Sequence, residues 1–169
     1  IIRSHGVPRS IINEINSKGI KYVDCTCPFV SRIHRIVEDK YCKGYKIVIV
    51  GDKKHPEVIG INGWCNNEAI IIDDEKMVDK LPYYDKICLV AQTTFSKNLW
   101  HRIKERVKEK FNNAEIFDTI CNATENRQKS VIELAKKVDV MLVIGGFNSS
   151  NTIKLYELAR QYCPNTYHI

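Results

Sequence analysis

Residues 46–58, KIVIVGDKKHPEV, show the strand–loop–helix order on which the predicted fold is built. An apolar run, Ile47–Val50, is followed by Gly51, by a polar loop and by a proline. A short β-branched run of this kind is typical of a strand buried on both faces, and proline suits the first turn of a helix. The stretch therefore predicts a strand, a glycine-led loop that carries His55, and a helix with Glu57 in its first turn.

The same order recurs later in the chain at a constant spacing. Residues 22–57 align without gaps on residues 116–151. The matched positions include Asp24 and Asp118, Cys27 and Cys121, Gly51 and Gly145, and His55 and Ser149. A looser match relates Arg3-Ser4-His5-Gly6 to Ala91-Gln92-Thr93-Thr94. Because chance would not readily align Asp, Cys and Gly together, we interpret the chain as duplicated α/β lobes.

Short apolar runs alternate with amphipathic helical patterns along the rest of the chain. The expected strands are Tyr22–Cys25, Lys46–Val50, Ala69–Ile72, Lys86–Ala91, Glu115–Asp118 and Val140–Gly145, and Thr166–Ile169 is strand-like. Helices are expected after Pro8, Pro28, His55, Ser96, Thr124 and Ser149, with Gly19 and Gly44 at helix ends. This alternation predicts an α/β fold with mainly parallel sheets.

Composition narrows the class of protein. The chain has 169 residues, 44% of them hydrophobic, and a formal net charge of +6. Much of the excess charge falls on amphipathic helices such as Lys97–Lys110, and the sequence shows no pattern of aromatics interleaved with charges on one surface, so we expect no nucleic-acid partner. No apolar run reaches the roughly 20 residues of a membrane helix, so we expect no membrane partner. The seven dispersed cysteines favour a reducing, cytoplasmic location.

Polar clusters follow the predicted strands and begin the predicted helices. They are His5-Gly6, Cys27-Pro28, residues 53–57, Gln92-Thr93-Thr94, Cys121-Asn122 and residues 148–151. Ligands of open α/β sheets bind at the carboxyl ends of the strands, where helix N-termini suit phosphate. We therefore expect the clusters to line one cavity that binds a phosphorylated ligand.

Cys27 and Cys121 hold equivalent positions at predicted helix starts, where the helix dipole stabilises a thiolate. The alternative is that both are small buried hydrophobic residues, as free cysteines often are. Zinc and an iron–sulfur cluster both remain open as the metal, and two thiolates would need further ligands. The other cysteines, Cys25, Cys42, Cys65, Cys88 and Cys163, are interpreted as structural.

The clusters, taken in order, resemble the LytB/IspH family of 4-hydroxy-3-methylbut-2-enyl diphosphate reductases. The stretches that carry the resemblance are Arg3–Pro8, Asp24–Pro28, His55–Val58, Ala91–Thr94, Asp118–Thr124 with Asn126–Gln128, and Asn148–Asn151. The resemblance implies three similar α/β lobes, in pseudo-threefold arrangement, around a [4Fe–4S] cluster held by three cysteines. The implied reaction is reductive dehydroxylation of an allylic alcohol diphosphate to isopentenyl and dimethylallyl diphosphates. The implied electron donor is a ferredoxin or a flavodoxin.

The resemblance also implies a role for each matched residue. Cys27 and Cys121 would be two cluster ligands, and Glu57 with Thr93 would supply a proton. The implied substrate-binding residues are His5, His55, Thr93, Ser149, Ser150 and Asn151, and all of these except Thr93 are implied contacts of the diphosphate. Cys25 stands where the family has a small residue such as Ala, and we interpret it as a core substitution.

The third cysteine ligand of the family falls outside this chain. We expect residues 1–26 to be the end of a first lobe, 27–118 a complete second lobe and 119–169 the beginning of a third. Residues 1–169 alone should then bind a cluster poorly and show no turnover. Two alternatives remain, a non-catalytic α/β module that binds a phosphorylated ligand with structural cysteines, and a zinc hydrolase.

Overall fold

The computed structural model describes the backbone of residues 1–169, and every side chain except those of Thr124, Glu125 and Ser150. The chain divides into two compact units, Ile1–Ile120 (unit 1) and Cys121–Ile169 (unit 2). Each unit is described by itself below.

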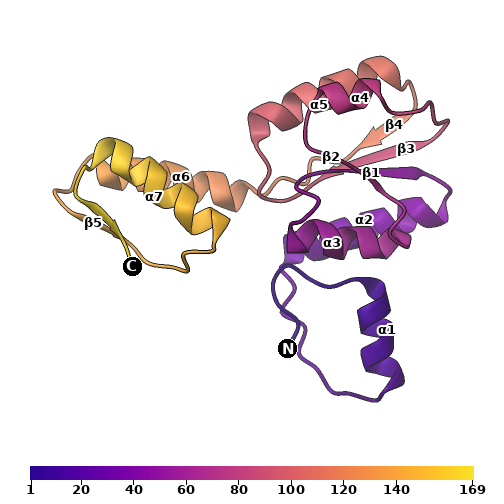
Figure 1. The fold of residues 1–169 in the computed structure, drawn as a ribbon, viewed down its shortest axis with the longest axis horizontal. Coiled ribbons are helices and arrows are strands. Elements are labelled where there is room, and N and C mark those ends of the chain that lie inside the picture. The colour runs from indigo at the N-terminus through magenta and orange to yellow at the C-terminus, as the bar shows by residue number, and fades with distance from the viewer. The chain divides into compact units, whose positions relative to one another are not determined.

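Unit 1 is built on a parallel sheet. Its strands are β1 (Lys46–Val50), β2 (Ile70–Ile72), β3 (Ile87–Ala91) and β4 (Ala114–Ile116), in the order β2-β1-β3-β4 (Figure 1). All three pairings are parallel, so the carboxyl ends of the strands meet at one edge of the sheet. The predicted parallel α/β fold is confirmed.

Helices cover both faces of this sheet (Figure 1). On one side lie α2 (Pro28–Cys42), α3 (Pro56–Asn62) and the short 3-10 helix Gly63–Cys65; on the other lie α4 (Lys76–Asp79) and α5 (Lys97–Lys110). Because side chains alternate along a strand, Ile47 and Ile49 pack against α2 and α3. Val48 and Val50 pack on the opposite face, against α5. The helix α4 and the 3-10 turn were not predicted.

The N-terminal segment differs from the prediction. After α1 (Arg9–Ser17), the expected strand Tyr22–Cys25 is not a strand and makes a single parallel bridge, between Ile2 and Asp24. A strand needs a partner along its length, and here Tyr22 and Val23 are exposed. Cys25 is exposed as well, so its interpretation as a core substitution is wrong for this structure.

Unit 2 is a smaller α/β unit. It consists of α6 (Asn122–Ala135), β5 (Met141–Val143), α7 (Ser150–Tyr162) and β6 (Thr166–His168), and β5 and β6 pair in parallel. Its core is formed by residues of both helices, of β5 and of the C-cap of α7, namely Ala135, Met141, Val143, Ala159 and Cys163. The predicted strands at 140–145 and 166–169 are confirmed, whereas α6 begins earlier than expected, directly after Cys121.

The predicted helix ends are confirmed. Gly19 and Gly44 lie just beyond α1 and α2 with φ of 63° and 79°, the left-handed conformation that commonly ends a helix. Within the described residues, no helix combines the length and apolar character needed to cross a membrane.

Candidate active site

The chemistry of unit 1 gathers at the carboxyl ends of β1 and β3. The loop after β1 leads to His55, which is the N-cap of α3 and accepts a hydrogen bond at Nδ1 from the Glu57 N–H (3.2 Å). Pro56 holds the first helical position, as predicted. The next residue, Glu57, thus lies in the first turn of α3, beside the end of the neighbouring strand.

Glu57 and Thr93 form a buried pair, with 2% and 6% of their surfaces exposed. The Glu57 carboxylate accepts one hydrogen bond from the Thr93 backbone N–H at Oε1 (2.6 Å). It accepts a second from the Thr93 hydroxyl at Oε2 (2.7 Å). A buried charge is tolerated when donors satisfy it, so this arrangement holds a carboxylate in one orientation with a hydroxyl in contact.

Gln92 and Gly51 shape the loops that carry this pair. The Gln92 side-chain oxygen accepts from the Asp52 N–H (3.1 Å), and its amide nitrogen donates to the Thr94 hydroxyl (2.9 Å). A Cβ on Gly51 would lie 2.8 Å from Val58 Cγ2 and 2.9 Å from Gln92 Cβ. The loops after β1 and β3 can therefore pack this closely because residue 51 is a glycine. Gln92 was expected only as one of the polar residues at a helix start, and its bracing role emerges only from the adjacency of β1 and β3.

A pair of imidazoles lies next to this carboxylate. The rings of His5 and His55 meet edge to face, with centroids 5.4 Å apart. Burial lowers the pKa of His55, and the nearby Glu57 carboxylate partly opposes that shift. The buried Nδ1 of His5 has no hydrogen-bond partner within the described part of the chain. An unpartnered ring nitrogen of this kind is suited to donate to an anionic ligand.

The N-terminal segment reaches α3 by close backbone packing. A Cβ on Gly60 would lie 3.3 Å from the His5 carbonyl oxygen, so the glycine leaves room for the His5 backbone. The Cys27 N–H donates to the Ser4 carbonyl (2.9 Å). Contacts within unit 1 thus connect the His5 loop both to α3 and to the start of α2.

Both candidate ligand cysteines lie at helix starts, as predicted. Cys27 is the N-cap of α2 and half-buried, and Cys121 is the N-cap of α6 with 9% of its surface exposed. Among the side chains that the structure describes, no three His, Cys, Asp or Glu residues gather as a metal site.

The remaining cysteines, which the structure describes in full, are free thiols in two environments. Cys25 and Cys42 are exposed, whereas Cys65, Cys88 and Cys163 are buried. Burial raises the pKa of Cys65 to about 11 and of Cys88 to about 12, which makes both thiols poor nucleophiles and poor ligands near neutral pH.

Unit 2 repeats the local design of the β1–α3 connection. Ser149 caps α7 by accepting from the Thr152 N–H (3.3 Å), in the position that His55 holds at α3. A Cβ on Gly145 would lie 2.6 Å from Thr152 Oγ1, just as one on Gly51 would meet Val58. The Asn151 side-chain oxygen is buried, with no hydrogen-bond partner in the described residues. The Ser150 side chain lies outside them.

The structure therefore groups the predicted site residues as follows. Glu57, Thr93, His55 and His5 come together at one edge of the sheet of unit 1. Ser149 and Asn151 lie in unit 2, at the start of α7. Of the other histidines, His34 is buried in α2 and His101 is exposed on α5.

Comparison with known proteins gives a consistent family. A family model described as LytB protein matches residues 1–169. A 4-hydroxy-3-methylbut-2-enyl diphosphate reductase of Caldanaerobacter subterraneus subsp. tengcongensis is 50% identical over 169 residues, covering 100% of this chain and 59% of the relative. One of Alkaliphilus oremlandii is 52% identical over 170 residues, covering 100% of this chain and 61% of the relative.

Solved structures agree with these relatives. An (E)-4-hydroxy-3-methyl-but-2-enyl diphosphate reductase superposes with a TM-score of 0.76 at 40% identity, covering 99% of this chain and 61% of that one. The E-1-hydroxy-2-methyl-but-2-enyl-4-diphosphate reductase from Plasmodium falciparum gives 0.77 at 32% identity, covering 98% and 53%. The chain spans less than two thirds of the length of these relatives. Because the family model matches every residue from 1 to 169, the chain belongs to the LytB family.

Proposed function

We propose that the protein containing this chain reduces (E)-4-hydroxy-3-methylbut-2-enyl diphosphate to isopentenyl and dimethylallyl diphosphates, in the cytoplasm and in the non-mevalonate pathway. The relatives with this reductase name match the whole chain at about half identity. The observation that carries the proposal is the buried Glu57–Thr93 pair beside two imidazoles at the strand ends.

The proton chemistry falls to Glu57 and Thr93. Loss of the hydroxyl group as water consumes two electrons and two protons, one proton going to the departing oxygen and one to carbon. When the Glu57 carboxylate has taken up a proton, it can donate that proton to an oxygen bound beside it, and the Thr93 hydroxyl, in contact with Oε2, can pass it along. The Thr93 N–H then stabilises the carboxylate that results, since it donates to Oε1 at 2.6 Å.

The diphosphate contacts are proposed for His5, His55, Ser149, Ser150 and Asn151. In unit 1, the unpartnered Nδ1 of His5 supports this assignment. In unit 2, the start of α7 supports it, because a helix N-terminus offers N–H groups and a positive dipole end. Holding the diphosphate would fix the reacting end of a small substrate relative to Glu57.

Cys27 and Cys121 are proposed as ligands of a [4Fe–4S] cluster. The residues fit this group, since both thiols are N-caps of helices of about four turns, where the dipole favours the thiolate. The third cysteine ligand is proposed to lie outside residues 1–169. When bound, the cluster would supply the electrons, with an iron as Lewis acid, and a ferredoxin or flavodoxin would replenish them one at a time.

The lobe boundaries at residues 26 and 118 stay a prediction, as does the inactivity of residues 1–169 alone. If the chain holds only part of the cluster ligands, residues 1–169 alone should bind a cluster poorly and show no turnover. Robust reductase activity from the fragment would contradict the proposed division.

The test uses the full-length protein with Glu57→Gln, which keeps the shape of the side chain but removes its acid. We expect kcat to fall by about 10²–10⁴-fold, as for the loss of a general acid, while diphosphate binding measured by calorimetry changes little. Glu133→Gln, on an exposed position of α6, is the matched control and should leave kcat unchanged. Unaltered turnover in Glu57→Gln would refute the proton role.

The same preparation separates the reductase from the non-catalytic binding module. A double variant, Cys27→Ser with Cys121→Ser, should lose iron and sulfide and all turnover. If the wild-type protein is colourless and binds the diphosphate equally well with both cysteines replaced, the binding module is correct.

A further inference from the structure

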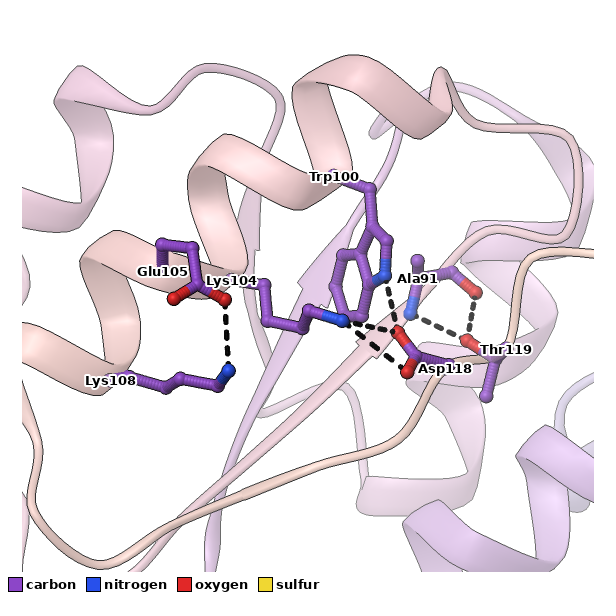
Figure 2. A network of polar contacts seen from close by, with 7 residues as sticks. All are labelled: Ala91, Trp100, Lys104, Glu105, Lys108, Asp118 and Thr119. Carbon is purple, nitrogen blue, oxygen red and sulfur yellow. Dashed lines mark hydrogen bonds and ion pairs between the residues drawn. The ribbon is translucent and has the colours of Figure 1, made fainter.

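The segment that leads from β4 to Cys121 is anchored to unit 1 through the side chain of Thr119 (Figure 2). The Thr119 hydroxyl accepts from the Ala91 N–H (2.8 Å) and donates to the Ala91 carbonyl (2.7 Å). Backbone pairing of β3 and β4 continues as far as the Phe117 N–H, which donates to the Leu89 carbonyl (3.0 Å). Beyond Phe117, the Thr119 side chain, which is 5% exposed, replaces the backbone as the hydrogen-bond partner of Ala91, the last residue of β3.

The neighbouring residue, Asp118, makes a second anchor on α5 (Figure 2). Its carboxylate accepts from the Trp100 indole N–H (2.7 Å) and contacts the Lys104 ammonium (3.2 Å). The Asp118 side chain is exposed, so the ion pair with Lys104 contributes little, and the bond from the buried Trp100 is the directional one. The following residue, Ile120, packs against the core of unit 1.

The equivalent aspartate of the first repeat is used differently. Asp24 accepts from the backbone N–H and the hydroxyl of Thr26 (2.9 and 2.5 Å), one residue before Cys27. Cys27 itself is held by its N–H to the Ser4 carbonyl. Each candidate ligand cysteine is therefore preceded by a hydrogen-bonded Asp and Thr. Before Cys27 the two bond to each other, whereas before Cys121 they bond to β3 and α5.

We propose that Thr119 and Asp118 are positioning residues for the Cys121 thiol. We call these two side chains and their partners Ala91 and Trp100 the latch. The proposal rests on the proposed function, in which Cys121 is a ligand. The latch holds the main chain up to the residue before Cys121. The backbone that carries the thiol is therefore already ordered before the metal centre binds, so less conformational entropy is lost on binding.

The test uses the full-length protein and Thr119→Val, which removes both hydroxyl hydrogen bonds at constant shape. Thr166→Val is the matched control, because Thr166 is equally buried and donates to the Cys163 carbonyl (2.6 Å) at the amino end of β6. Thr119→Ser retains the hydroxyl and should restore the wild-type behaviour. The first measurement is the rate at which an iron chelator removes the cluster anaerobically, followed by visible absorbance, beside the Tm of each variant.

We expect Thr119→Val to lose its cluster about tenfold faster than wild type, equivalent to about 1.4 kcal/mol. Thr166→Val should release its cluster at the wild-type rate even though its Tm falls comparably. If both valine variants released the cluster at the same rate, the latch would contribute to stability alone and the proposal would be overturned. An unchanged rate in Thr119→Val would overturn it too.

A second measurement tests this inference without relying on the proposed function. In cluster-free full-length protein, alkylation by iodoacetamide is resolved by residue in a mass spectrometer. Thr119→Val should change the rate at Cys121 several-fold while the rate at Cys27 stays constant. If wild-type protein binds no iron, the proposed function fails, and this measurement still decides the latch. Rates at Cys121 that match wild type would overturn it.

Discussion

The buried histidine His34 predicts an acid-sensitive step in stability. The ring is 4% exposed and stacks on Trp64, with centroids 5.0 Å apart. A Cβ on Gly6 would lie 2.5 Å from His34 Cε1, so the His5–Gly6 loop lies directly on this ring. Burial lowers the pKa of His34 from 6.5 to about 4, partly opposed by Asp24. Among the described residues, its Nε2 has no hydrogen-bond partner.

The sign and size of the effect follow from proton linkage. Between about pH 6.5 and 4, the unfolded chain binds a proton at this histidine and the folded chain does not. Stability therefore rises with pH in this window and is lost as the pH falls. Above pH 6.5 the free energy of unfolding is unaffected by His34 protonation. By the time the pH has fallen to the folded pKa, the protein has lost ~3 kcal/mol of this free energy.

The assay is urea unfolding of the full-length protein, followed by tryptophan fluorescence at a series of pH values. His34→Phe keeps a flat ring against Trp64 and cannot be protonated, so it should lose ~2 kcal/mol less than wild type between about pH 6.5 and 5. His101→Gln, at an exposed position of α5, should retain the wild-type dependence. Identical pH slopes for wild type and His34→Phe, or a His34 pKa near 6.5 by NMR, would refute the reasoning.

Three further outcomes follow from the geometry. Thr93→Val should lower the free energy of unfolding by about 1.5–3 kcal/mol, because it leaves one oxygen of the buried Glu57 carboxylate without its donor, and Thr93→Ser should not. Gly51→Ala should cost about 1–3 kcal/mol by overpacking, whereas Gly146→Ala, with no atom within 4 Å of its Cβ, should be neutral in the same denaturation assay. Cys65, whose pKa is raised to about 11 by burial, should resist iodoacetamide at about pH 8 until the protein unfolds, while the exposed cysteines react; early modification of Cys65 would contradict its burial.

Local patterns were sufficient for most of the elements. The apolar run of β1, the proline after His55 and the glycines after α1 and α2 act within a few residues, over the periods of a strand or a helix turn. Cys27 and Cys121 were placed at helix starts for the same reason. The prediction failed at Tyr22–Cys25, because a strand depends on its partner as well as on its own residues.

The candidate site itself depended on tertiary structure. Glu57 and Thr93 belong to different loops, and they meet because β3 pairs directly with β1 in the strand order β2-β1-β3-β4. The resemblance to a family named both residues, but nothing in their sequence neighbourhoods specifies the two hydrogen bonds between them. His5 likewise lies beside His55 through a long-range contact, in which the His5 backbone packs closely on Gly60. Strand order and close backbone packing are long-range properties that arise when apolar faces are buried together, and no short pattern in the chain reports them.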